Sequence, residues 1–411
     1  MIVLVANVGS SSYKFQLIEM PTERTLARGG VERIGNAPSR YSYSSEDGET
    51  SSGDLHAPNH LAAIEHSAEF LTSGTAKRKI LHGLDALGGI GLKAIFAKGH
   101  TSSALIDENI VNALEAYIPL VPLHNPAYIA SIRAFERLAP SVPQAAVFET
   151  WFHETLPDYA REFGVPRSWV EQYGVRRYGF HGASHRYIAQ RVPDVLERLG
   201  SHLRSHASLR VVSCHLGGSS SLCAIRGGVS IDTSMGLSAQ SGVLQGTRCG
   251  DLDAFAVLYM LDDGGLSVSE AHDALMTDGG LAGISGVGSD MRDIIAASEK
   301  GNTNARLAMD TYHYGVKKTI GAYAAALGGI DVLAFTGGIG EKGPVNRAAI
   351  CDGLEFLGIE LDLVRNESHK GEGPISRAGG QTPVLVIPAN EEIIVARETA
   401  RLIDARGAPP A

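Results

Sequence analysis

One short pattern occurs twice in this chain, and the two copies lie about half a chain length apart. Residues 2–8 form an apolar, β-rich run that ends in the turn Gly9-Ser10-Ser11-Ser12, and residues 211–216 lead into the matching turn Gly217-Gly218-Ser219-Ser220-Ser221. Aligning the two serine triplets gives an offset of 209 residues, and the runs that follow both turns also have strand character. Gly/Ser hairpins are common enough to recur by chance, but the matching flanks favour duplication. The repeat therefore predicts two related domains with a cleft between them.

The sequence between and after these hairpins alternates helical and strand patterns. Helical spacing of apolar residues occurs at 60–72, 106–116, 129–138, 185–199 and 304–327. Short apolar runs at 332–335 and 384–387, bounded by Gly or Pro, are typical of buried strands. Residues 93–96 are harder to assign because the run opens with a charge, and the serine-rich segment 37–55 predicts a surface loop or an edge hairpin. The predicted fold class is α/β with mixed sheets.

Composition and charge exclude several classes of protein. The chain has 48 glycines in 411 residues, well above the usual share of roughly 7%, yet it shows no G-X-Y period and no low-complexity tract. The surplus therefore predicts tight turns and close backbone contacts. A net charge of −9 disfavours a nucleic-acid partner. The most apolar stretch, 320–340, holds Asp331 and six glycines, which disfavours a membrane span.

The cysteines and the N-terminus bear on location. Four scattered cysteines suit neither a disulfide framework nor a zinc site, and the chain opens on an apparent strand rather than a signal peptide. Both features predict a reducing, cytoplasmic setting.

Three kinds of segment could bind an anion. A Gly/Ser turn after a strand directs backbone N–H groups and hydroxyls toward a phosphate, and Lys14 follows the first turn closely enough to reach the same anion. Residues 336–341 place glycines directly after an apolar run, and three arginine-containing segments also lie near glycines, at 176–182, 246–251 and 290–293. Plain turns and solvated surface arginines are the alternatives for each segment alone. Together the segments favour phosphoryl transfer, whereas the chain lacks the Walker A and dinucleotide-binding fingerprints.

A candidate metal ligand lies near the C-terminus. Glu391 or Glu392 would begin a helix after Pro388-Ala389-Asn390, and phosphoryl transfer uses carboxylates to hold its metal ion. The alternative is a helix N-terminus whose first turn simply carries favourable acidic residues.

Taken in order, these segments resemble the acetate kinase family over nearly the whole chain, from Val3 to about Arg401. The resemblance is carried by residues 7–15, 122–126, 177–185, 232–236, 246–248, 283–286, 338–341 and 390–392. It implies the two-domain fold shared by acetate and sugar kinases and actin-like ATPases, with a nucleotide cleft between duplicated domains. It also implies an acyl-substrate domain at 1–150 plus 391–411 and a nucleotide-binding domain at 151–390.

The resemblance further implies a reaction and its residues. The reaction is reversible, in-line phosphoryl transfer from ATP to acetate or propionate, with Mg²⁺ or Mn²⁺, in a homodimer. The composition already predicts a cytoplasmic protein that binds neither nucleic acid nor membrane. Carried over by position, the catalytic residues are Glu149, His181 and Arg248, the substrate-binding residues are Lys93, His124 and Phe180, and the metal ligands are Asn7 and Glu391. The nucleotide-binding residues are Ser12, Lys14, His215, Leu216, Gly217, Gly218, Ser219, Asp290, Met291, Arg292, Gly338, Ile339, Gly340, Glu341 and Lys342.

The acyl side departs from the family pattern. Lys93 stands where the family usually has an arginine, and Glu149 where it has a catalytic aspartate. Lysine keeps the charge but loses the bidentate fork of arginine, and glutamate moves the carboxylate by up to about 1.5 Å. The two changes could compensate each other, which predicts a divergent but active acyl kinase. Ala239 replaces the usual proline of the acyl-methyl pocket and leaves room for propionate or a larger acid.

Two other interpretations stay open at this stage. One is a kinase for another short-chain carboxylate, and the other is a catalytically weak nucleotide-binding sensor. Lys93 and Glu149 are the main support for the sensor. The phosphate loop also departs from the family, since Gly217-Gly218-Ser219 replaces the usual Gly-Asn-Gly.

Overall fold

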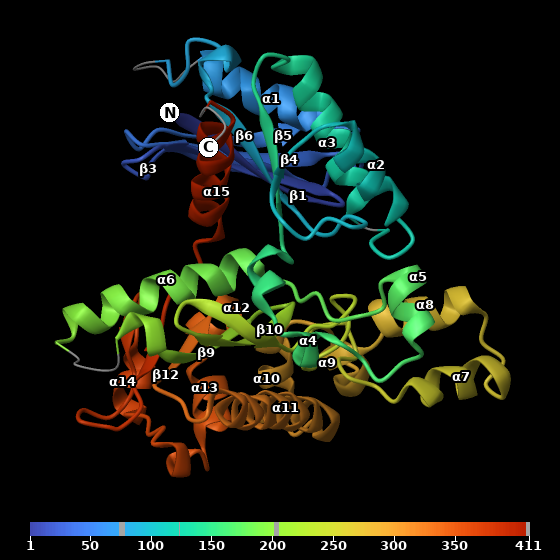
Figure 1. The fold of residues 1–411 in the computed structure, drawn as a ribbon, viewed down its shortest axis with the longest axis vertical. Coiled ribbons are helices and arrows are strands. Elements are labelled where there is room, and N and C mark those ends of the chain that lie inside the picture. Colours follow the sequence, from blue (N-terminus) through green and yellow to red (C-terminus); the bar gives the residue numbers. More distant parts are fainter. Residues whose placement is uncertain (74–78, 123, 201–204, 408–411) are drawn as a thin grey trace. The chain divides into compact units, whose positions relative to one another are not determined.

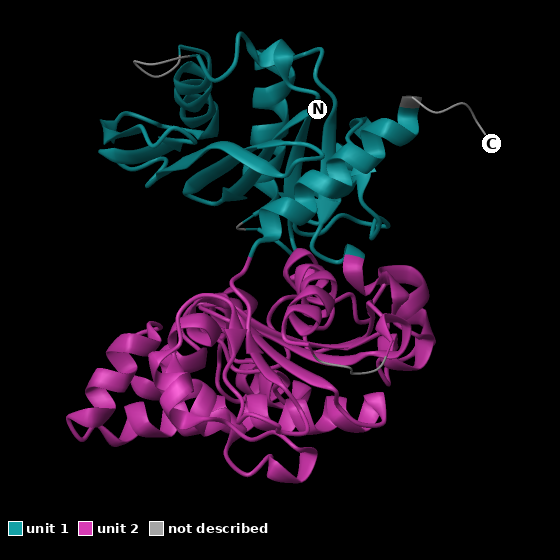
Figure 2. Ribbon diagram, turned by 90° about the vertical axis from the view of Figure 1, so that its left-hand side faces the viewer, with its two compact units in different colours: residues 1–151, 390–411 teal, residues 152–389 magenta. Residues whose placement is uncertain are grey.

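The computed structural model describes residues 1–73, 79–122, 124–200 and 205–407 (Figure 1). These residues form two compact units (Figure 2). Unit 1 comprises Met1–Trp151 and the C-terminal segment from Asn390, and unit 2 comprises Phe152–Ala389.

Unit 1 is built on a mixed sheet whose strand order is β5-β4-β3-β2-β1-β6-β8-β7. The strands are β1 (Ile2–Gly9), β2 (Ser12–Glu19), β3 (Arg24–Glu32), β4 (Ser39–Ser45), β5 (Thr50–Leu55), β6 (Gly89–Ala94), β7 (Ala104–Leu105) and β8 (Gln144–Phe148). The helices are α1 (His60–Ser73), α2 (Glu108–Ala116), α3 (Asn125–Leu138) and α15 (Glu391–Gly407). Strands β1, β6 and β8 are parallel, and the remaining pairs are antiparallel.

Alternation along β6 determines how α15 lies on this sheet. Ile90 and Leu92 are buried in the core that α1 and α3 share with the sheet. The intervening glycines face α15, since a Cβ at Gly91 would lie 2.3 Å from Thr399 Oγ1. Only glycine permits so close an approach. Lys93 continues the same alternation, which directs its side chain toward the start of α15.

Unit 2 repeats this topology with the strand order β11-β10-β9-β12-β14-β13. The strands are β9 (Arg210–Leu216), β10 (Ser220–Arg226), β11 (Val229–Thr233), β12 (Val332–Thr336), β13 (Gly373–Pro374) and β14 (Val384–Val386). The helices are α4 (Asp158–Arg161), α5 (Arg167–Tyr173), α6 (Gly182–Arg198), α7 (Ala254–Asp262), α8 (Val268–Met276), α9 (Gly280–Ser285), α10 (Met291–Glu299), α11 (Thr303–Leu327), α12 (Gly337–Lys342), α13 (Pro344–Cys351) and α14 (Leu363–Ser368).

The predicted duplication is confirmed by the strand directions. Each unit begins with three consecutive strands that pair antiparallel. The first of these three also pairs in parallel with a later strand, which pairs in parallel with another. The parallel strands β1-β6-β8 of unit 1 therefore correspond to β9-β12-β14 of unit 2. The two repeated turns differ slightly in length. Gly9 pairs with Ser12 in the first hairpin, whereas Leu216 pairs with Ser220 in the second, which has one more residue in its turn.

The sheet of unit 2 is covered on both faces. One face packs against α11 in a core that includes Val212, Leu222 and Phe335. The other face packs against α6, with Val211 and Ile225 contacting the same cluster as Ile188. By alternation, Ser213, His215 and Ser221 also lie on the α6 face. This face therefore changes from apolar to polar toward the N-terminal end of α6.

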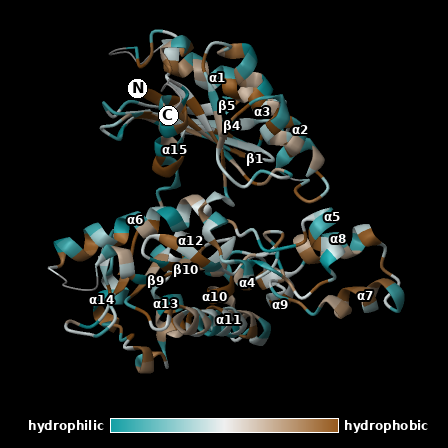
Figure 3. Ribbon diagram, in the orientation of Figure 1, coloured by the Kyte–Doolittle hydropathy of each residue, from teal (hydrophilic) through white to brown (hydrophobic). Residues whose placement is uncertain are grey.

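Helix α7 differs from the other long helices of unit 2. Its sequence, AFAVLYMLD, is strongly apolar (Figure 3), but none of its residues is buried. Phe255 and Tyr259 are 75% and 62% exposed. Unit 2 therefore presents an unusually apolar surface along α7.

The predicted helices and strands are all present, with shifted ends. Helices α2, α3 and α6 begin at Glu108, Asn125 and Gly182. The segment 37–55 forms the edge hairpin β4–β5. The strand β6 runs from Gly89 to Ala94, so the run that was hard to assign, 93–96, contributes only its first two residues to it. Within the described ranges, no helix is both long and apolar enough to cross a membrane.

Candidate active site

The carboxyl ends of β6 and β8 bring Lys93 and Glu149 together. Lys93 Nζ lies 3.1 Å from Glu149 Oε1 and also donates to Glu391 Oε2 at the start of α15. No side chain of the three is more than 16% exposed. Burial lowers the pKa of Lys93, but the two carboxylates outweigh burial and hold that pKa well above its usual value. The cluster therefore holds a permanent cation between two nearly buried carboxylates.

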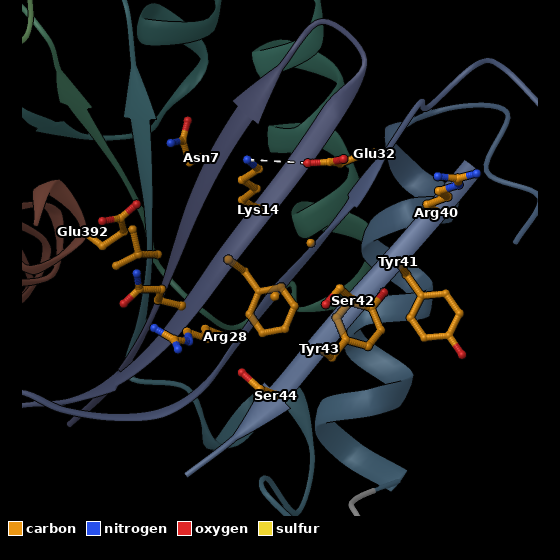
Figure 4. A pocket seen from close by; sticks show the side chains of 15 residues that line it. Asn7, Lys14, Arg28, Glu32, Arg40, Tyr41, Ser42, Tyr43, Ser44 and Glu392 are labelled. Carbon is orange, nitrogen blue, oxygen red and sulfur yellow. Dashed lines mark ion pairs between the residues drawn. The ribbon is translucent and has the colours of Figure 1, made fainter. Parts of the chain in front are cut away.

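A hollow of about 650 Å³ lies on the sheet of unit 1 (Figure 4). Asn7 from β1 and Glu392 from α15 line it together with Lys14 from β2. The Lys14 ammonium lies 3.7 Å from Glu32, and both side chains are more than 60% exposed. Asn7 thus shares a cavity with Glu392, whereas Glu391 is engaged by Lys93.

The acidic residues of α15 and Asn7 fit a magnesium ion rather than a fully protein-enclosed metal. All their donors are oxygens, which Mg²⁺ prefers. Among the described residues, no group of three His, Cys, Asp or Glu side chains could hold a metal. Mg²⁺ commonly takes one or two carboxylates and completes its shell with substrate phosphates and water. These residues therefore suit an ion that is bound jointly with a nucleotide.

His124 lies at the N-cap position of α3 and is half-buried. The next residue, Asn125, is fully buried and donates to the carbonyl oxygens of Phe96 and Leu114, at 3.1 and 2.8 Å. These bonds fix the backbone at His124. Leu123, within the predicted substrate loop, lies outside the described residues.

His181 begins α6 in an unusual backbone conformation. Its φ is +57°, in the left-handed region that is rare for residues other than glycine. Its ring stacks on that of His215, with centroids 4.2 Å apart, and its Nδ1 lies 2.8 Å from Ser221 Oγ. Such strain at a non-glycine residue is typical of functional positions.

A second histidine holds the segment that precedes His181. His153 Nε2 donates to the carbonyl oxygen of Phe180 at 3.0 Å, so its Nδ1 must accept from Ser230 Oγ at 2.9 Å. Burial lowers the pKa of His153 to about 4. The bond to Phe180 opposes this decrease, and the positive charge of Arg177 adds to it. Phe180 is itself buried. Its backbone is therefore anchored by a neutral histidine.

Arg248 is held by a small polar network on the same unit. Its Nη1 donates to Ser219 Oγ at 3.1 Å and to the carbonyl oxygen of Ala239 at 3.2 Å. Gln245 is fully buried and connects the same groups, because its Oε1 accepts from Ser219 at 2.8 Å and its Nε2 donates to Ala239. Burial lowers the pKa of Arg248, although a guanidinium stays charged at neutral pH.

A cavity of about 520 Å³ gathers most of the predicted nucleotide-binding residues of unit 2. The predicted residues that line it are Gly217, Gly218, Asp290, Met291, Arg292, Gly338, Ile339 and Lys342. The rest of its lining consists of Ser289, Ile295, Gly343 and Asn346. Asp290 caps α10 through the backbone N–H of Arg292 and pairs with its guanidinium at 2.6 Å, and these bonds lower the pKa of Asp290 to about 2. A volume of this size suits a small organic ligand.

The remaining predicted nucleotide residues lie outside this cavity. His215 and Ser219 contact His181 and Arg248, as described above, while Leu216 is buried in the core. Gly340 is buried within the short helix α12, and Glu341 accepts from the backbone N–H groups of Gly337 and Ala389. Ser12 and Lys14 belong to unit 1.

Comparison with known proteins assigns the family. A family model described as the Acetokinase family matches residues 2–397. The chain belongs to this family. It is 42% identical to the acetate kinase of Dictyoglomus thermophilum over 402 residues, which is 98% of this chain and 99% of that protein. It is 41% identical to the acetate kinase of Phocaeicola vulgatus over 98% of this chain and 99% of that one.

Solved structures of acetokinases agree with the fold. The acetate kinase of Porphyromonas gingivalis superposes with a TM-score of 0.86 at 36% identity, covering 98% of this chain and 99% of its own. A propionate kinase from Francisella tularensis has the same TM-score at 33% identity, again covering 98% and 99%. The predicted resemblance and the predicted two-domain α/β fold are both confirmed.

Three residues that contact the candidate acetokinase site were missed from the sequence. Tyr128 lies buried beside Lys93, and burial together with Glu149 and Glu391 raises the pKa of its phenol. Gln245 and Ser221 are the other two. Gln245 directly precedes the Gly246-Thr247-Arg248 motif, and Ser221 ends the repeated serine triplet, so both were adjacent to motifs already identified.

Proposed function

We propose that this acetokinase transfers the γ-phosphoryl group of ATP to the carboxylate of acetate or propionate, reversibly and in line. The observation that carries the proposal is the cavity of unit 2, where eight residues expected to bind nucleotide line a single space of about 520 Å³. The acetate and propionate kinases among the relatives support the choice of substrate.

Each unit has a distinct role in this proposal. Unit 2 binds ATP in its cavity, and His181 and Arg248 stabilise the charge on the phosphoryl group in transfer. Unit 1 provides the acyl side, where Lys93 attracts the carboxylate and Glu149 and Glu391 keep that lysine charged and oriented. We propose His124 of unit 1 and Phe180 of unit 2 as further substrate-binding residues.

Mg²⁺ is the metal that we propose for this enzyme, with Asn7 and Glu391 as ligands and Glu392 close to Asn7. When bound, it would neutralise phosphate charge during transfer. Because Lys93 already contacts Glu391, binding of the metal requires that carboxylate to serve both cations. Asn7 and Glu392, which share a cavity, provide the oxygen donors that are not engaged by Lys93.

The acyl specificity is proposed to extend beyond acetate. Ala239 has only a methyl side chain, and its carbonyl oxygen is fixed by Gln245 and Arg248. Because alanine is smaller than the proline usual at this position in the family, we propose that it leaves room for propionate beside acetate. One methylene in an apolar pocket changes specificity by about 10- to 200-fold at most, so acetate and propionate should both be used.

A hydroxamate assay over the C2 to C5 acids tests the proposed function. We expect acyl hydroxamate from acetate and propionate with MgATP, and falling yields for longer acids. An Arg248→Lys control should lose most of the activity, because lysine cannot replace the three contacts of the guanidinium. Failure to form any hydroxamate from all four acids would refute the proposal.

We also propose a cytoplasmic homodimer in which a second copy of the chain covers α7. The support is the apolar surface of that helix, where Phe255, Leu258 and Tyr259 are at least half exposed. The four free thiols are consistent with a reducing compartment. Sedimentation equilibrium should give twice the mass of the chain, and a Phe255→Ser, Tyr259→Ser variant should shift toward the monomer. A monomeric wild-type protein at micromolar concentration would contradict the dimer.

A further inference from the structure

Two buried serines and a buried histidine connect to His181 through an unbroken series of hydrogen bonds. Ser221 Oγ lies 2.8 Å from His181 Nδ1 and also 2.8 Å from Nε2 of His185. The other ring nitrogen of His185, Nδ1, lies 2.9 Å from Ser213 Oγ. Ser213, Ser221 and His185 are all 0% exposed. The series Ser213–His185–Ser221–His181 is therefore sealed from water except at its His181 end.

The sequence places these four residues together by two regular periodicities. His181 and His185 are four residues apart at the start of α6, so their rings lie on one side of the helix. Ser213 and Ser221 lie on the α6 face of the neighbouring strands β9 and β10, two rows apart in register. The rigid sheet thus presents two hydroxyls at the spacing of one imidazole ring.

His185 is neutral at physiological pH. Burial lowers its pKa well below the usual value, and the nearby His153 and His215 add to the effect. A neutral imidazole carries one N–H donor and one acceptor nitrogen. The hydrogen bonds of His185 must therefore run in one direction along the series.

Counting the buried protons determines that direction. Apart from His185, the hydroxyl of Ser213 has no hydrogen-bond partner among the described residues. If His185 donated to Ser213 from Nδ1, the hydroxyl proton of Ser213 would be buried without an acceptor, which is costly. Ser213 therefore donates to Nδ1 of His185, and His185 donates from Nε2 to Ser221.

The same count extends to His181. Ser221 has a single hydroxyl proton, and it already accepts from His185, so it donates that proton to Nδ1 of His181. A neutral His181 must then carry its own proton on Nε2. We infer that Ser221 is a positioning residue which, through His185 and Ser213, keeps His181 in the Nε2–H tautomer. On the proposed function, this makes Nε2 a ready hydrogen-bond donor to a phosphoryl oxygen.

Alanine at position 221 should disturb the tautomer without removing either histidine. In Ser221→Ala, Nδ1 of His181 loses the hydroxyl that donates to it, so the preference for one tautomer weakens. Loss of one oriented hydrogen bond in the transition state corresponds to a decrease in kcat of about 10-fold. The KM values for ATP and the acid should change by less than about 2-fold, because Ser221 is enclosed and reaches the ligand only through His181.

Two substitutions of His185 form a matched pair. The amide of glutamine occupies roughly the position of Nε2, so His185→Gln can still donate to Ser221. The amide of asparagine occupies roughly the position of Nδ1, so His185→Asn keeps only the bond to Ser213. We expect His185→Gln to retain several-fold more kcat than His185→Asn, although both remove the same ring. Equal kcat values for the pair would overturn the assignment.

Imidazole ¹⁵N NMR tests the inference without reference to activity. In the wild-type protein, the His181 signal, identified by its absence in His181→Gln, should show a protonated Nε2 and an unprotonated Nδ1. In Ser221→Ala the two nitrogen shifts should move toward each other. A wild-type His181 protonated on Nδ1, or a tautomer unchanged in Ser221→Ala, would refute the inference. An inactive wild-type enzyme with the expected spectrum would instead refute the proposed function alone.

Discussion

Removing the positive charge of Lys93 should destabilise unit 1 strongly. The ammonium lies 3.1 Å from Glu149 and also binds Glu391. With an effective dielectric constant of about 20, one such contact corresponds to roughly 5 kcal/mol of Coulomb attraction, part of which offsets the cost of burying the ions. Deleting one partner of a buried ion pair typically costs about 3–5 kcal/mol, because the other charge is left uncompensated. We expect that loss in Lys93→Met.

Thermal unfolding in chelator, without nucleotide, provides the assay. A loss of this size lowers the Tm of a domain of 150–250 residues by roughly 10 °C. The double variant Lys93→Met, Glu149→Gln should recover part of the loss, since it removes one of the two unpaired carboxylates. A Lys93→Met protein whose Tm decreases by less than about 2 °C would refute the electrostatic reasoning.

Charge-preserving changes separate stability from function. Lys93→Arg with Glu149→Asp keeps both charges but shortens the acid and lengthens the cation. If the pair is co-adapted, the double variant should keep its Tm within about 3 °C and lose activity on acetate. A gain in activity on acetate would instead show that the natural pair is degenerate.

Two further predictions concern unit 2. Gln245→Ala removes the side chain that connects Ser219 to Ala239 beside Arg248, so kcat should decrease about 10-fold. Gln240→Ala is the control, because its amide oxygen has no partner among the described residues; equal losses in both variants would contradict this role. The second prediction concerns His153 and His185, which burial keeps neutral in the folded state, whereas both bind protons below about pH 6.5 when unfolded. Their contribution to stability is therefore complete above pH 6.5 and is lost as the pH decreases, by roughly 2 kcal/mol for His153 at pH 5. The Tm of His153→Gln should depend less steeply on pH than that of the wild type, and an unchanged slope would contradict this explanation.

Much of the fold follows from local patterns in the sequence. The two Gly/Ser hairpins and the helical periodicities gave the duplicated topology, because alternation and 3.6-residue spacing are local properties of the chain. The run 93–96 was hard to assign because it opens with the charge of Lys93, and the strand β6 itself begins earlier, with Gly89 and Gly91, which carry no hydropathy signal. These glycines allow α15, which lies about 300 residues further along the chain, to pack closely against β6.

The candidate site was predictable only in part for the same reason. The motif residues were identified from a family resemblance, which also singled out Lys93 and Glu149 as two changes that could compensate each other. The ion pairs of Lys93 with Glu149 and with Glu391 were not predicted, because both contacts join distant segments. Gln245 and Ser221 act through hydrogen bonds to groups on other segments of the chain, and hydropathy patterns alone do not reveal such bonds.

The most direct test of the account is ³¹P NMR of the wild-type enzyme with MgATP and acetate or propionate. The account predicts that an acyl phosphate signal and ADP increase in equal amounts, and that adding acyl phosphate to ADP reverses the change. Formation of ADP with inorganic phosphate alone, or no reaction with either acid, would contradict it.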